Sequence, residues 1–391
     1  MRIKLLLLIL VFFFASEVKA QQKQLSSQAE ISVLTLGPGT SLNDSFGHNS
    51  FRIKDTLLGI DYTYNYGVFD FNTPNFYTKF ARGKLNYRIE KNQYKNFINF
   101  YILQNRTVKE QVLNLSQFEK QLLYDYLINN YKPENQYYLY DFFFDNCATK
   151  IRDVIPIILK EDINFKEPEG FTLKTFRRLI HDHVDRNSWG GFGIDIALGS
   201  VIDKKATANE HMFLPQYIYL FFENAQINSS KPLVKQSNIL FESIKKPKPD
   251  NFFTSPLFIF GIIGLLILLI TFFDYKNNKR SNWLDVLIFG FTGIVGVLIL
   301  LLWFATDHSA TAQNYNLLWA FALNIFVIPQ LFKKEVKKWI IKYLKFLLIM
   351  LCLLTLHWII GIEIFAIGLI PILIAFFIRY LYLIKYYHKK I

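Results

Sequence analysis

Cys147 lies in the stretch DFFFDNCATKIRD (141–153), at the point where a helix is predicted to begin. Asp145 and Asn146 are suitable N-cap residues, so the thiol is expected in the first helical turn. Free backbone N–H groups and the positive end of the helix dipole stabilise a thiolate there and lower its pKa. The apolar residues that follow place Cys147 on a face directed at the core or a sheet. Two interpretations stand, a reactive nucleophile and an inert core cysteine.

A cysteine nucleophile needs a base, usually histidine, and often a third group that orients the base. Four histidines precede the apolar part of the chain, namely His48, His181, His183 and His211. His48 opens a predicted strand. His181 and His183 lie in the charge-rich stretch RRLIHDHVDRN, which we interpret as an exposed helix end, and no clear third ligand accompanies the pair, so no metal site is predicted. His211 is interpreted as a packing or capping residue.

The third group has two candidates on the strand predicted to follow His48. Asp61 would stabilise an imidazolium, whereas Asn65 would only fix the tautomer of the ring. Each is equally typical of ordinary strand ends and turns. Arg152 also has two interpretations, a surface pair with Asp153 or a contact to a lipid phosphate.

An α+β fold is predicted to position these residues. Alternating β-branched and aromatic residues predict strands at 31–37, 48–54, 60–69, 85–91, 107–115 and 136–144. Ser116 and Glu119 form a capping box that predicts a helix over 116–132. The helix that begins at Cys147 is expected to reach about Ile155, because Pro156 removes a backbone donor.

The first 20 residues, MRIKLLLLILVFFFASEVKA, predict a secretory signal peptide. They combine a basic start, an apolar run and a small-residue cleavage site. An uncleaved anchor is the alternative. Both interpretations predict that residue 21 onward is exported.

The composition changes at Pro256, where long apolar runs begin. They predict five membrane spans, at about 256–273, 283–304, 315–332, 339–360 and 363–384. Lys and Arg gather at 274–280, at 333–338 and in the C-terminal tail, and they are missing from 305–316 and 360–363. The positive-inside rule therefore places the basic loops and the C-terminus in the cytoplasm. The domain at 21–227 and the expected linker at 228–255 then lie on the outer face.

The charge and the cysteine count exclude two further possibilities. The chain has a net charge of +13, but most of the basic excess lies in the signal segment and the membrane part. A nucleic-acid-binding protein would carry that charge on its exported domain, so this class is excluded. Cys147 and Cys352 are the only cysteines, and Cys352 lies within the fourth predicted span, so no internal disulfide is expected. An unpaired thiol is unusual in an exported domain.

Several strings of the chain resemble the DUF4105 / Lnb family. They are FGHNSFRI, DYTYNYGVFDF, TPNFYTKFARG, FFFDNCATKIRD, LGSVIDKKATANEHMFLP and TDHSATAQNYNLLW. The resemblance covers nearly the whole chain. It implies a papain-like thiol domain of the permuted NlpC/P60 type, with the histidine on an early strand and the cysteine at a later helix start. The family pattern maps to His48 as base and Cys147 as nucleophile.

The resemblance also implies a function, that of a lipoprotein N-acyltransferase in the inner membrane of a bacterium, with its thiol domain in the periplasm. A phospholipid would donate an acyl chain, the N-terminus of a diacylated lipoprotein would accept it, and no cofactor is needed. The outer loop at 305–316 carries Asp307 and His308, which are expected either to complete the substrate site or to form a simple interfacial turn.

Three rival functions stay open. A cell-wall peptide hydrolase would use the same dyad, but five membrane spans are hard to explain for that task. A lipid hydrolase would transfer the acyl group to water rather than to an amine. A membrane-tethered binding domain would keep Cys147 as a core residue, out of reach of thiol reagents.

Overall fold

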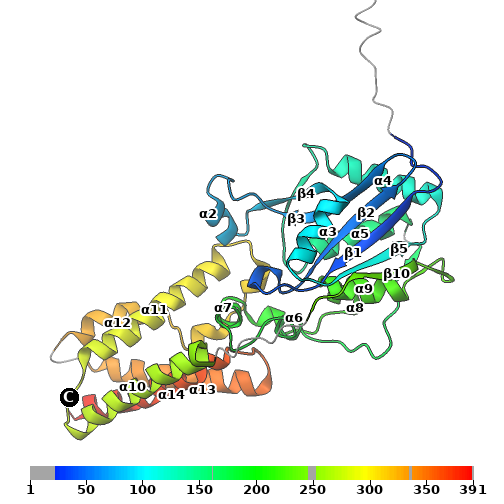
Figure 1. The fold of residues 1–391 in the computed structure, drawn as a ribbon. Helices are drawn as coiled ribbons and strands as arrows, with labels where there is room; N and C mark the ends of the chain where they lie inside the picture. The colour runs from blue at the N-terminus through cyan, green and yellow to red at the C-terminus, as the bar shows by residue number, and fades with distance from the viewer. Residues whose placement is uncertain (1–22, 161, 245–251, 334–336, 390–391) are drawn as a thin grey trace, which may run out of the picture.

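The structure is a computed structural model that describes residues 23–160, 162–244, 252–333 and 337–389. The expected signal peptide at 1–20 lies outside these residues. A sheet domain built from the first part of the chain sits at one end of a helical membrane domain (Figure 1). The predicted α+β class is confirmed.

The sheet has seven strands in the order β10-β5-β1-β2-β3-β4-β6, and all neighbours are antiparallel. Its strands are β1 (Glu30–Leu36), β2 (His48–Asp55), β3 (Ile60–Val68), β4 (Asn86–Gln93), β5 (Val108–Leu113), β6 (Tyr137–Leu139) and β10 (Val234–Phe241). His48 is the first residue of β2, where it lies opposite Leu36 of β1. A small second sheet contains β7 (Ile163–Asn164), β8 (Gln226–Ile227) and β9 (Lys231–Pro232).

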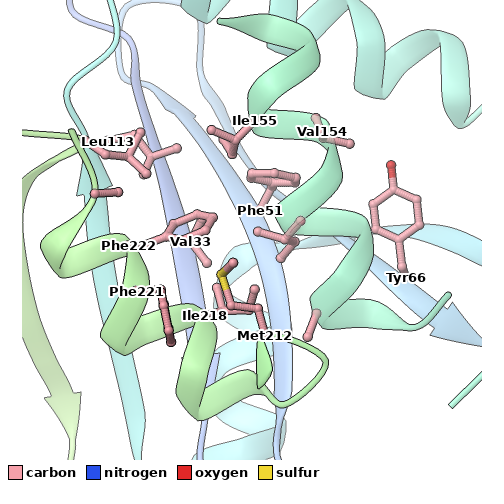
Figure 2. Close-up of a cluster of buried hydrophobic side chains, with 14 of the residues drawn as sticks. Val33, Phe51, Tyr66, Leu113, Val154, Ile155, Met212, Ile218, Phe221 and Phe222 are labelled. Carbon is pink, nitrogen blue, oxygen red and sulfur yellow. The ribbon is translucent and has the colours of Figure 1, made fainter. Parts of the chain in front are cut away.

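Helices cover both faces of the main sheet because side chains alternate along each strand. One face packs Leu34 and Leu36 against α3 (Tyr94–Leu103). The other face packs Val33 and Phe51 against a larger core (Figure 2). That core comes from α4 (Gln117–Asn130), α5 (Cys147–Ile158) and α9 (Pro215–Asn224). The largest core of the domain thus lies between α5 and the middle of the sheet.

Four shorter helices complete the domain, namely α2 (Phe76–Ala81), α6 (Phe176–His181), α7 (Trp189–Ala197) and α8 (Ala208–His211). Short 3-10 turns lie at Leu42–Asp44, Ser200–Ile202 and Phe252–Thr254. The helices α6 and α7 lie on the side of the domain that faces the membrane helices (Figure 1).

Three local predictions need correction. The helix α5 continues to Ile158, because Pro156 in its last turn removes a single backbone donor and this loss does not end the helix. The strand expected at 136–144 is only three residues long, since a turn follows it. The segment expected as a linker, 228–255, contains β10, which pairs with β5 at the edge of the sheet.

The membrane domain has four helices long and apolar enough to cross a bilayer within the described residues. They are α10 (Pro256–Lys276), α11 (Asn282–Phe304), α13 (Trp339–Ile360) and α14 (Ile370–His388), the last preceded by a 3-10 turn at Ile367–Leu369. The first, second, fourth and fifth expected spans are thus continuous helices, whereas the third has no continuous helix of that length among the described residues.

The expected third span, 315–332, contains a 3-10 turn at Tyr315–Leu318 and the eight-residue helix α12 (Asn324–Leu331). Glycines on α11 explain why this irregular segment fits. A Cβ at Gly296 would lie 2.1 Å from the Ala320 carbonyl oxygen. The segment's backbone thus packs directly on another helix, which is where irregular backbone at membrane depth is tolerated.

A polar core joins the two domains. Arg177 of α6 pairs with Asp195 of α7 at 2.9 Å and with Asp203 at 2.9 Å. His181 contacts the same Asp195 oxygen at 2.9 Å, and its side chain is only 6% exposed, whereas an exposed helix end was expected. From the membrane domain, the Asn316 side chain donates to the Asp195 carbonyl at 3.0 Å. These bonds anchor the sheet domain on the outer loop.

Candidate functional site

Cys147 begins α5, as predicted, and Asn146 caps the helix. The Asn146 Oδ1 accepts from the N–H groups of Ala148 at 2.8 Å and Thr149 at 2.9 Å. Its Nδ2 donates to the carbonyls of Phe142 and Phe213, so the cap is held from both sides. The cap fixes the first turn of α5 and with it the position of the thiol.

The sulfur of Cys147 lies beside the start of β2. The backbone N–H of Asn49 donates to it, and so do N–H groups of the first turn of α5. Asn49 directly follows His48, so the helix start and the strand start meet at the sulfur. A Cβ added at Gly67 of the next strand would lie 3.7 Å from the Cβ of Cys147. Gly67 has a positive φ of 86°, so a side chain there would be strained, although its Cβ would meet its neighbours only at ordinary contact distance.

Burial governs the electrostatics of the thiol. It raises the pKa of Cys147 to about 11, although the N–H of Asn49 and the positive charge of Arg106 act in the opposite direction. The helix start was expected to give a lowered pKa. The expectation is wrong for the resting protein, because the desolvation of a buried thiolate raises the pKa by more than the helix start lowers it.

His48 is also neutral at rest. Burial, followed by the charge of Arg106, lowers its pKa to about 4, while a hydrogen bond with the Asn65 side chain acts upward. Asn65 Nδ2 donates to Asn92 Oδ1 at 2.8 Å, which leaves Asn65 Oδ1 to accept from the imidazole N–H. The ring of Tyr101 stacks over His48 with 6.3 Å between centroids. A neutral imidazole of defined orientation and a neutral thiol are thus both under the influence of the Arg106 charge.

Asp61 lies far from His48. It faces Lys54 across the strand pair, six residues along β2, which corresponds to about 20 Å. It also forms a two-pronged bond with Arg52, at 2.8 Å for each prong. Its carboxylate is thereby committed to a structural ion pair. Of the two candidates for the orienting group, the structure brings only Asn65 to the imidazole.

Arg152 also lies apart from the thiol. Its guanidinium bonds both carboxylate oxygens of Asp153, the closer at 2.6 Å, and the Asn209 carbonyl at 3.2 Å. The Arg152 guanidinium is thus hydrogen-bonded to its neighbour Asp153 and to the helix α8. The surface-pair interpretation fits this geometry, and a contact of Arg152 with a lipid phosphate stays a prediction.

Asp307 and His308 meet the sheet domain at α2 rather than at the sulfur. The Asp307 N–H donates to the Arg82 carbonyl at 2.9 Å, and His308 Nε2 bonds the Phe80 carbonyl at 3.0 Å. The next residue, Ser309, donates to Asp141 Oδ2 at 3.2 Å. The outer loop thus contacts both α2 and the turn that precedes Cys147.

Arg106 is the residue that sequence reasoning missed. It is buried, its Nε donates to the Gly37 carbonyl at 2.8 Å, and its guanidinium lies 4.7 Å from the centroid of Tyr101. Its Nη2 is buried without a hydrogen-bond partner among the described residues. The charge acts on both His48 and Cys147. No local motif marks it, because the residues it influences are distant in the sequence.

The other histidines have structural partners. His211 accepts from the Lys174 N–H at 3.1 Å and bonds the Thr207 carbonyl at 2.8 Å, which agrees with a packing or capping role. His183 bonds the Leu179 carbonyl. Within the described ranges, His, Cys, Asp and Glu form no group of three or more that could hold a metal ion.

Comparison with known families gives two matches. One family, described as the Lnb N-terminal periplasmic domain, matches residues 17–182, which include His48, Asn65, Arg106 and Cys147. The other, described as the Lnb transmembrane domain, matches residues 248–390. Comparison with curated proteins and with solved structures gave no match. The two family matches together cover most of the chain, which therefore belongs to the Lnb family, with a periplasmic domain joined to a transmembrane domain.

Proposed function

We propose that the chain is a membrane-bound thiol acyltransferase. It moves a fatty-acyl chain from a phospholipid, through a Cys147 thioester, to the N-terminal amine of a diacylated lipoprotein. The observation that carries the proposal is the thiol at the start of α5, which accepts from the backbone N–H of Asn49, the residue that directly follows His48 in β2. Both substrates live in a bilayer, which explains why the thiol domain is joined to membrane helices.

In the first half-reaction the sulfur attacks the ester carbonyl of a phospholipid. His48 accepts the thiol proton as the C–S bond forms, since both groups are neutral at rest. The ester C–O bond then breaks, and His48 returns the proton to the departing oxygen of the lysophospholipid. No thiolate has to exist beforehand, so the high thiol pKa is compatible with general-base catalysis.

In the second half-reaction the neutral amine of the lipoprotein attacks the thioester. A C–N bond forms and the C–S bond breaks, while the proton lost by the nitrogen passes through His48 to the sulfur. The acyl group rests on the enzyme between the two steps, so ping-pong kinetics are expected. Water as the acceptor would make the same dyad a lipid hydrolase.

Three groups would assist both steps. The N–H of Asn49 and the N–H of Cys147 point to the sulfur, and they are placed to donate to the oxyanion that forms beside it. Asn65 would hold the imidazole in the tautomer whose free nitrogen faces the thiol. The positive charge of Arg106 would stabilise negative charge on the sulfur and on the oxyanion.

The order of the dyad, a histidine on a strand followed by a cysteine at a helix start, supports the papain-like class of the permuted NlpC/P60 type. We also assign the chain to the inner membrane of a bacterium, with its C-terminus in the cytoplasm. This orientation rests on the basic loops at 274–280 and 333–338.

Mass spectrometry of a reporter lipoprotein tests the proposal. Cells that lack their own N-acyltransferase would express the wild type, Cys147→Ala, His48→Ala or the control Cys352→Ala. We expect an amide-linked acyl chain on the N-terminal peptide with the wild type and with Cys352→Ala, and none with the two site variants at equal protein level.

A folded and abundant wild type that adds no acyl chain would overturn the assignment. Release of free fatty acid that depends on Cys147 would then identify a hydrolase. A wild type whose Cys147 stays unmodified by thiol reagents over the whole range from pH 6 to pH 10 would identify a non-enzymatic domain.

A further inference from the structure

A segment of exposed aromatic residues leaves the sheet directly after β3. We call residues 69–83 the aromatic arm, and it contains α2. Phe71 is 67% exposed, Tyr77 78% and Phe80 53%. Three large aromatic side chains close together on a surface indicate a binding surface rather than ordinary exposure. Such rings are typical of segments that lie at a membrane interface.

The arm lies at the outer end of the membrane helix α11 (Figure 1). The outer loop that follows α11 holds it there through the bonds from Asp307 and His308 to the carbonyls of Arg82 and Phe80. A Cβ at Gly83 would lie only 3.3 Å from the Asp307 carbonyl carbon, so the arm and the loop are in close contact. The exposed rings therefore stand at the level where α11 leaves the bilayer.

The arm is also basic on this side. Lys79, Arg82 and Lys84 belong to it or directly follow it, and Asp307 contacts one of them, Lys84, at 3.6 Å. Cations beside exposed aromatic rings complement a phosphate that sits above an apolar layer. The charge thus favours a phospholipid surface as the occupant over an apolar protein partner.

A continuous series of rings connects the arm to the thiol. Centroid distances are 6.4 Å for Phe80–Phe76, 5.8 Å for Phe76–Phe69, 5.4 Å for Phe69–Tyr87 and 4.3 Å for Tyr87–Tyr140. Tyr140 lies beside the open position at Gly67, at 3.9 Å from a Cβ placed there, and that same position is 3.7 Å from the Cβ of Cys147. The series thus runs from the bilayer level to the nucleophile.

We propose that the aromatic arm inserts into the outer leaflet and that its rings guide the acyl chain of a phospholipid to Cys147, with the arm's cations on the lipid phosphate. This rests on the proposed function for its chemistry, but the insertion itself is independent of any turnover. It gives the arm two parts, an exposed tip for the leaflet and a packed base that leads inward.

Site-directed spin labelling tests the insertion without any catalytic reaction. In a Cys147→Ser, Cys352→Ser background, Tyr77→Cys would be labelled in the full chain reconstituted in nanodiscs of phosphatidylethanolamine and phosphatidylglycerol. The matched control is Phe118→Cys, on α4, whose native side chain is 64% exposed. We expect the label at 77 to be accessible to dissolved oxygen and shielded from a water-soluble nickel complex, with the reverse at 118.

Equal nickel accessibility at 77 and 118 would overturn the insertion. Immobilisation of the label at 77 only when a lipoprotein is added would also overturn it, and would identify a protein partner instead. Neither outcome depends on whether the chain transfers acyl groups, so the two proposals can fail separately.

A turnover comparison tests the acyl route. The triple variant Phe71→Ser, Tyr77→Ser, Phe80→Ser is compared with Phe118→Ser, using phospholipid vesicles and a water-soluble short-chain thioester as alternative donors. We expect the triple variant to lose at least tenfold more activity with vesicles than with the soluble donor. Equal losses with both donors would contradict the route, whereas a wild type inactive with both donors would contradict the proposed function.

Discussion

Two buried polar clusters in this protein each contain an arginine, and the two arginines differ in how many of their donors have a hydrogen-bond partner. In the polar core between the domains, Arg177 bonds Asp195, Asp203 and the carbonyls of Leu198 and Gly199. Beside the thiol, Arg106 donates to one carbonyl, and its Nη2 has no partner among the described residues. A buried arginine with a complete set of partners serves the fold. One left with a free donor next to a nucleophile is available to charge that develops during a reaction.

The two clusters also differ in the carboxylates that lie near the arginine. Asp203 and Asp195 lie against Arg177, yet burial still raises the pKa of Asp203 to about 6. Beside Cys147 and His48, Arg106 forms no ion pair in contact among the described residues, although the charge of Asp44 acts on it. The polar core therefore pairs its arginine with carboxylates in direct contact, and the thiol site leaves an arginine donor free for negative charge that forms on the sulfur or on an oxyanion.

Removal of the paired arginine should have the largest effect. Arg177→Ala leaves two buried carboxylates without their partner and is expected to lower the free energy of unfolding by about 3–5 kcal/mol. Arg178→Ala, its largely exposed neighbour on α6, is the matched control, with an expected change of about 0.5 kcal/mol or less. Thermal unfolding of the purified protein in detergent measures both. Equal losses would mean that the polar core does not hold the domains together.

Removal of the unpaired arginine should act on rate more than on stability. Arg106→Gln is expected to lower acyl transfer about 10- to 100-fold, because an uncompensated positive charge near the sulfur is lost. It should also raise the pKa of the Cys147 thiol, since the charge acts to lower it. Arg106→Lys keeps the charge and should recover part of the rate. An Arg106→Gln enzyme with unchanged rate and thiol pKa would remove Arg106 from the site.

Substitutions of Asn65 and Asp61, the two candidates for the orienting group, should likewise differ, one affecting mainly the rate and the other mainly the stability. Asn65→Ala should lower acyl transfer about tenfold, since the imidazole loses the acceptor that fixes its tautomer. Asp61→Asn should leave the rate within about twofold of the wild type and lower the melting temperature, because it weakens only the pair with Arg52. The acyl-transfer rate and the melting temperature of both variants show which of the two residues orients His48. A rate loss with Asp61→Asn alone would reverse the assignment.

The pH dependence of thiol reactivity gives the smallest and most specific effect. With a Cys147 pKa of about 11, the thiolate is a small fraction at pH 7 and grows about tenfold with each pH unit up to pH 10. His48, with a pKa of about 4, is uncharged over this range and cannot form an ion pair with it. Alkylation of Cys147 by iodoacetamide, in a Cys352→Ala background, should rise steadily from pH 6 to 10. A plateau across pH 5–8 would indicate a preformed thiolate–imidazolium pair.

Local sequence signals predicted the elements that carry the dyad. The capping box at Ser116 is present in the structure, and Asn146 caps the helix that starts at Cys147. Both signals act over three or four residues, within reach of a sequence pattern. The alternation of side chains likewise predicted β2, with His48 as its first residue.

Features set by distant partners could not be predicted. Arg106 acquires its role from His48 and Cys147, which lie far away in the chain, and Asp61 loses its expected role to Arg52 on the neighbouring strand. The hydropathy of 315–332 predicted a span but not its irregular backbone, because composition does not report that Gly296 lets that backbone pack against α11. The lowered thiol pKa failed for the same reason, since burial depends on the whole fold.

The most direct test of the account is to look for an acyl group on the sulfur of Cys147. The purified chain would be incubated with phospholipid vesicles and no amine acceptor, and the peptide that contains Cys147 would be analysed by mass spectrometry. The account predicts an acyl chain on this peptide that neutral hydroxylamine removes and that His48→Ala prevents. Formation of lysophospholipid by the wild type, with Cys147 unmodified at every time point and dispensable for the reaction, would contradict it.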